Sequence, residues 1–103
     1  MVNIIIYVKR EFSAEDLVSL LLSKELIASA SIDENNISYV MHDGVIHKES
    51  YNIITAKSKG LLLDQIINAV EEKIGAEVLI IAIPIVGSNK FFFELVSENT
   101  MRI

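Results

Sequence analysis

The sequence predicts an α+β fold of the ferredoxin-like class, a βαββαβ sandwich followed by a short C-terminal helix. Two apolar runs without any charge, residues 2–8 and 78–86, have the length of buried strands. Residues 14–24 and 61–74 carry apolar side chains at helical spacing. Asp43-Gly44 lies between two short apolar–polar runs and is a strong hairpin signal. Right-handed crossovers then place both main helices on one face of the sheet.

The first half of the chain is expected to form a strand, a helix and the start of a hairpin. Ser13 is a good N-cap for the first helix, because Asp16 follows three residues later as in a capping box. Leu26–Ile32 is predicted as the second strand, and the polar residues Asp33–Asn36 are interpreted as a turn. Strand character resumes at Ile37–Met41.

The second half returns from the hairpin through Val45 to Lys57 and then enters the second helix. Gly75 is well placed to end that helix, and the last strand lies within Glu77–Gly87. Pro84 cannot donate a hydrogen bond to a sheet, so it should sit at an edge or at a strand end. Phe91–Glu98 is predicted as the short C-terminal helix.

The composition limits the class of protein. A chain of 103 residues with 51% hydrophobic and 22% charged residues fits one folded domain spanning residues 1–103. The net charge of -5 disfavours nucleic-acid binding, which needs a basic surface. Absence of cysteine excludes disulfides and thiolate chemistry, and fits a reducing compartment. No apolar run reaches membrane-spanning length, and no secretory leader is recognisable, so we expect a cytoplasmic protein without a membrane partner.

The last strand also predicts self-association. Its residues are apolar at successive positions, so both of its faces require burial. The helices cover only one face of the predicted sheet, and no remaining segment is large enough to cover the other. A closed homo-oligomer resolves this problem, because a neighbouring copy then covers the open face.

Three segments, Leu20–Ile32, Tyr39–Ile46 and Ile80–Gly87, carry patterns that together resemble those of the CutA divalent-cation-tolerance family. The segment Leu20–Ile32 resembles the end of that family's first helix and its following strand, with Ser29 in place of a cysteine. The segment Ile80–Gly87, which contains Ala-Ile-Pro-Ile, is similar to the family's Ile-Ala-Leu-Pro-Ile strand. In the hairpin, Tyr39–Ile46 resembles the family's aromatic-x-Gly-x-Ile pattern, with one residue extra. The family's His-Pro-Tyr-Glu-x-Pro motif is absent, since Lys73–Val78 stands there.

This resemblance implies a non-catalytic homotrimer linked to divalent metal cation tolerance or binding, or to scaffolding of partners. The wider group contains PII-like signalling trimers, which bind small effectors in clefts between subunits. The alternative function is therefore a PII-like sensor of a small anionic effector or nucleotide.

A metal site is predicted at the hairpin. His42 and His47 flank the Asp43-Gly44 turn and Glu49 is close by. Imidazole and carboxylate ligands suit divalent ions such as copper, zinc or nickel. The competing interpretation is a solvated hairpin tip that binds no metal. The sequence therefore requires no cofactor, and a divalent ion such as copper is the one that this site could bind.

An anion or effector site is the second prediction, formed by the four basic residues Lys9, Arg10, Lys57 and Lys59. They follow the first and third strands, which are taken as adjacent and parallel, so the charges and both helix N-termini should meet at one end of the sheet. The competing interpretation is that strands simply have polar ends. Neither a glycine-rich phosphate loop nor a serine–histidine spacing is present, so no enzyme activity is expected.

Overall fold

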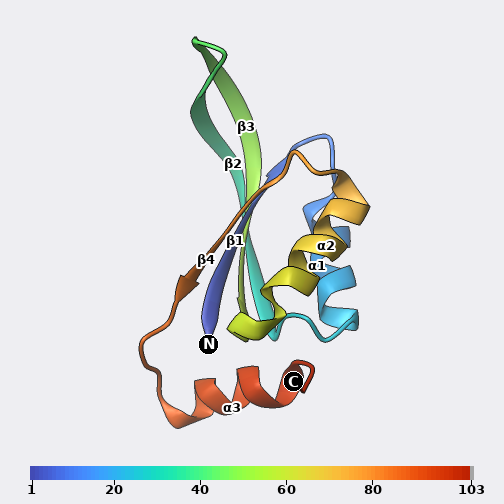
Figure 1. Ribbon diagram of the computed structural model, residues 1–103, viewed down its shortest axis with the longest axis vertical. Coiled ribbons are helices and arrows are strands. Elements are labelled where there is room, and N and C mark those ends of the chain that lie inside the picture. The colour runs from blue at the N-terminus through green and yellow to red at the C-terminus, as the bar shows by residue number, and fades with distance from the viewer. Residues whose placement is uncertain (103) are drawn as a thin grey trace.

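The chain folds as a four-stranded antiparallel sheet with two helices, residues 14–23 and 63–74, on one face (Figure 1). This computed structural model describes residues 1–102. The sheet order is β2-β3-β1-β4, which confirms the predicted ferredoxin-like topology. In chain order the elements are β1 (Val2–Lys9), α1 (Ala14–Ser23), β2 (Ser29–His42), β3 (Val45–Ser58), the 3-10 turn η1 (Gly60–Leu62), α2 (Leu63–Ile74), β4 (Leu79–Pro84) and α3 (Lys90–Asn99).

The core lies between the sheet and the helices α1 and α2. Alternate residues of a strand point to opposite faces, so Ile4, Ile6 and Val8 of β1 face the helices and are 0% exposed. Leu17 and Leu21 of α1 are equally buried. The predicted cap also forms, because Ser13 accepts a hydrogen bond of 3.2 Å from the backbone N–H of Asp16.

The hairpin of β2 and β3 extends beyond the helices as a two-stranded arm, here defined as residues 36–51 (Figure 1). Its turn is the predicted Asp43-Gly44, and both residues have left-handed backbone angles, with φ of 52° and 74°. A two-residue hairpin turn of this type matches the twist of the flanking strands. The arm therefore has a fixed register, with His42 opposite Val45.

The predicted turn at Asp33–Asn36 was wrong, because β2 is one strand of 14 residues with a bulge at this place. One extra residue is absorbed between the pairs Asp33↔Ile53 and Asn36↔Tyr51. Asn35 has φ 62°, and its backbone N–H donates to the Asn52 side-chain oxygen at 3.3 Å. The strand also begins at Ser29 rather than at Leu26, because Leu26 lies in the turn that follows α1, where its N–H donates to the Leu21 carbonyl.

The last strand lies at a sheet edge beside β1, as the proline predicted. Pro84 is the final residue of β4 and stands opposite Val2. One further backbone bond, from the Ile85 N–H to the Met1 carbonyl, continues the pairing past the proline. The predicted C-terminal helix is confirmed as α3, whose N-cap Asn89 accepts from the Phe92 N–H at 3.0 Å. Within residues 1–102, no helix is long and apolar enough to cross a membrane.

Candidate functional site

The predicted metal ligands line a hollow that runs along the arm, from Lys9 and Tyr51 at its root to His42 and His47 near its tip. This hollow, called here the arm hollow, has a volume of about 250 Å³. It lies on the sheet face opposite the helices, where β1, β3 and β4 meet the arm. Its charged and imidazole-bearing lining residues are Lys9, His42, His47, Glu49 and Glu77.

Strand register explains how the two histidines meet. Val40 pairs with His47 and His42 pairs with Val45, so the two imidazoles are diagonal neighbours on one face. Their ring centroids are 6.0 Å apart, with an interplanar angle of 66°. Both side chains are exposed, and the His42 Nδ1 lies 3.4 Å from the Asp43 carboxylate. The pair is therefore accessible to an ion from solvent.

Glu49 shares the hollow with the histidines but does not complete a metal cluster. It lies on the same face of β3 as His47, two residues further along. Nevertheless, residues 1–102 contain no group of three histidine, cysteine, aspartate or glutamate side chains that could hold a metal ion together. Zinc and copper sites in proteins use three or four ligands. One chain thus offers half of such a site, a pair of imidazoles.

The predicted anion site is not assembled. β1 and β3 are adjacent but antiparallel, so Lys9 and Arg10 lie at the opposite end of the sheet from Lys57 and Lys59. The cause is connectivity: α1 and β2 intervene, and β3 returns from the hairpin running against β1. Lys57 and Lys59 also already have hydrogen-bond partners within the chain. Lys57 Nζ donates to the Asn3 side chain at 2.9 Å, and Lys59 Nζ donates to the Met101 carbonyl at 2.9 Å.

Two residues of the arm hollow, Lys9 and Glu77, were not assigned to a site with the histidines. Lys9 follows Tyr7 on the open face by strand alternation, and its partner across the sheet is Tyr51. Glu77 comes two residues before Leu79, which pairs with Tyr7. The alternation in β1 could have placed Lys9 on this face, whereas the position of Glu77 depends on tertiary pairing of β4.

The open face of the sheet is apolar along its edge. On β4 the side chains of Leu79, Ile81 and Ile83 are 47%, 50% and 45% exposed. These residues pair with the outward residues of β1, which places them on the face away from the helices. A single chain therefore leaves a continuous apolar strip uncovered.

Taken together, these features define a small antiparallel βαββαβ protein with a long hairpin arm, an uncovered apolar sheet face and an exposed histidine pair. The family model described as CutA1 divalent ion tolerance protein matches residues 2–99. The chain belongs to this family.

Solved structures of CutA proteins have the same fold. A variant of CutA1 from Pyrococcus horikoshii superposes with a TM-score of 0.90 at 21% identity, covering 99% of this chain and 100% of that one. The divalent cation tolerance protein from Thermus thermophilus gives 0.90 at 19% identity, covering 98% and 100%. The periplasmic divalent cation tolerance protein CutA from Archaeoglobus fulgidus gives 0.86 at 24% identity, covering 96% and 98%. A comparison with curated proteins gave no match.

Proposed function

We propose that this protein is a non-catalytic homotrimer that binds a divalent metal cation, such as copper, in the course of divalent cation tolerance. The observation that supports cation binding is the exposed histidine pair near the tip of the arm, with ring centroids 6.0 Å apart. Imidazole nitrogen is a preferred ligand for copper and zinc. Because one chain supplies only this pair, the remaining ligands would come from water or from another subunit.

Two separate uncovered surfaces support a closed ring rather than a face-to-face dimer. The first is the β4 strip of Leu79, Ile81 and Ile83. The second is on the arm, where the side chains that face the helix side extend past the helices and are more than half exposed: Ile37 56%, Tyr39 69%, Met41 64% and Ile46 66%. When two different patches of one subunit contact each other in successive copies, the assembly is heterologous, and it forms a ring when the rotation between copies closes.

A ring also has a consequence for partners. Three arms would project from one assembly, which would suit scaffolding of a protein partner as well as cation binding. A PII-like role for a small anion has less support, because the four basic residues predicted for it lie at opposite ends of the sheet. A cytoplasmic location stays a prediction of the sequence.

The first experiment measures the mass of the native protein by sedimentation equilibrium. We expect a species of three times the chain mass that persists on dilution. A stable monomer would contradict the trimer, because the apolar strip and the arm would then be exposed to water in the native state. A dimer would contradict the ring.

The second experiment titrates the purified protein with Cu²⁺ by calorimetry. Replacing both ligands, in His42→Ala/His47→Ala, should lower the affinity by about tenfold or more, since losing even a hydrogen-bond partner of a metal ligand costs that much. Glu98→Gln on α3 is the control, because Glu98 is exposed and does not line the arm hollow. Equal Cu²⁺ affinity in the double variant and the control would overturn the assignment.

A further inference from the structure

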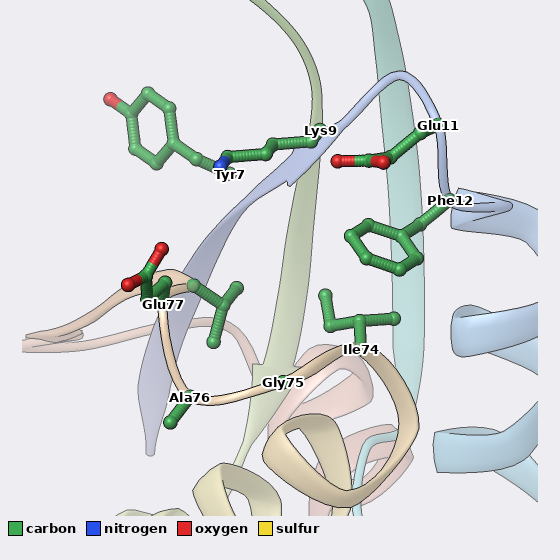
Figure 2. A pocket seen from close by; sticks show the side chains of 9 residues that line it. Tyr7, Lys9, Glu11, Phe12, Ile74, Gly75, Ala76 and Glu77 are labelled. Atoms are coloured by element: carbon green, nitrogen blue, oxygen red, sulfur yellow. The ribbon is translucent and has the colours of Figure 1, made fainter.

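A second hollow lies beside the arm hollow and has a different character. This hollow, called here the loop pocket, has a volume of about 330 Å³ and lies where the end of β1 and the loop into α1 meet the loop between α2 and β4 (Figure 2). Lys9 and Glu77 line both hollows. The volume is at the lower end of the range for small-molecule sites, which start at about 300 Å³.

One part of the loop pocket is apolar. Phe12, Ile74 and Val78 line it, and each is half-buried in the chain. Figure 2 shows the Phe12 ring and the Ile74 side chain beside each other on one side of the pocket, while Glu77 comes from the loop on the other side. An aliphatic group placed between these side chains would be removed from water, which is favourable.

The other part carries charges of both signs. Lys9, Glu11 and Glu77 line the pocket, and in the view of Figure 2 the end of the Lys9 side chain lies between the two carboxylates. The ion pairs found among residues 1–102 are His42–Asp43 and Lys90–Glu94, so Lys9 is not within 4.0 Å of either carboxylate. An ammonium and two carboxylates that line one pocket without pairing are free to contact a ligand.

We propose that the loop pocket binds a free α-amino acid with a branched aliphatic side chain, such as leucine. The ligand carboxylate would accept from the Lys9 ammonium, and the ligand ammonium would donate to Glu11 or Glu77. The aliphatic side chain would lie against Phe12, Ile74 and Val78. This assignment uses both signs of charge and the apolar wall of the pocket, and it does not involve the histidine pair.

Other ligand classes satisfy only part of the pocket. A nucleotide would bring several negative charges against Glu11 and Glu77, with a single lysine to oppose them. A simple alkyl amine would pair with a carboxylate but would meet the charge of Lys9. A simple alkyl carboxylate would pair with Lys9 but would meet both glutamates. Only a zwitterion places both signs of charge next to their opposites.

The test uses heteronuclear NMR of the full chain, with the backbone amides of Gly75 and Ala76 as reporters, because both residues line the pocket. Leucine should shift these resonances with a saturable titration. Glycine, which lacks the aliphatic group, should bind at least about tenfold more weakly if apolar burial contributes as usual. 3-Methylbutylamine and 4-methylpentanoate, which each lack one charge, should also be weaker. No saturable shift with leucine, or equal binding of the amine, would overturn the proposal.

Variants of Lys9 and Glu11 then test whether these charged side chains contact the bound amino acid. Lys9→Met and Glu11→Gln should each weaken leucine binding by about tenfold or more, because hydrogen bonds to charged groups are the stronger ones. Lys48→Met is the matched control, since Lys48 is exposed on the arm and lines neither hollow. Unchanged leucine affinity in Lys9→Met would contradict the assignment. Cu²⁺ titration of Glu11→Gln should match the native protein, because Glu11 does not line the arm hollow, so the two proposals can fail separately.

Discussion

The two faces of the sheet have similar chemistry and opposite environments. On the helix face of β1, Ile4, Ile6 and Val8 are 0% exposed. On the open face of β4, Leu79, Ile81 and Ile83 are each about half exposed, although they are equally apolar. The first face is fully buried within the chain, whereas the second leaves about half of its apolar side-chain surface in contact with water. The difference teaches that an apolar pattern identifies side chains that favour burial, while topology decides which face of the sheet the helices of the same chain cover.

The largest expected effect on stability comes from a substitution on the sheet face that the helices cover. Ile6→Ala should lower the free energy of unfolding by about 2 to 5 kcal/mol, because it removes buried methyl groups and leaves a cavity beneath the helices. Chemical denaturation at a fixed protein concentration measures this cost. A loss of under about 1 kcal/mol would mean that the core between sheet and helices relaxes around the cavity, and the contrast between the faces would then be weaker.

A substitution on the open face of the sheet provides the second test of the comparison between the two faces. Ile81→Lys should leave the fold intact, because the side chain is half exposed in one chain. It should lower the association constant of the proposed trimer by about a hundredfold or more, since an unpaired charge buried at an interface is very costly. Circular dichroism and sedimentation equilibrium measure the two effects. Leu22→Lys on α1 is the control, because Leu22 is 42% exposed but lies away from the open face, and an equal loss of mass in both variants would contradict the assignment.

The smallest expected effect is at the tip of the arm. Gly44 has φ +74°, so Gly44→Ala should cost about 1 to 2 kcal/mol through left-handed backbone strain. Gly87→Ala is the matched control, with open space around the added methyl group. Thermal unfolding followed by circular dichroism compares the two variants. A cost in Gly44→Ala equal to that in the control would indicate that the turn can change its conformation without strain.

Local patterns predicted most of the fold. The apolar runs, the Ser13 cap and the Asp43-Gly44 turn depend on neighbours in sequence, and their elements were placed to within a few residues. The bulge in β2 was missed because Asp33–Asn36 has the composition of a turn, and only the pairing with Ile53 and Tyr51 shows it to be a strand. Belonging to a sheet is decided by long-range hydrogen bonds that composition does not reveal.

The candidate sites show the same division between features set by neighbours in sequence and features set by long-range strand pairing. His42 and His47 were brought together by a hairpin turn, which is a local feature, and their proximity was predictable. The four basic residues were expected to gather because β1 and β3 were taken as parallel, and one error in strand direction separated them. The loop pocket combines Lys9 and Glu11 with Glu77, which are far apart in the chain, so it could not be recognised before the topology was known.

The bulge near Asn35 also makes the length of β2 adjustable. Before it, the odd-numbered residues Ser31 and Asp33 face the open side of the sheet, and after it the even-numbered residues Asn36 and His42 do so. One surplus residue is therefore taken up without changing the direction of any side chain in the arm. Deleting Asn35 would remove the surplus and leave His42 next to His47, so a protein of this type can gain or lose a residue here while its histidine pair is retained.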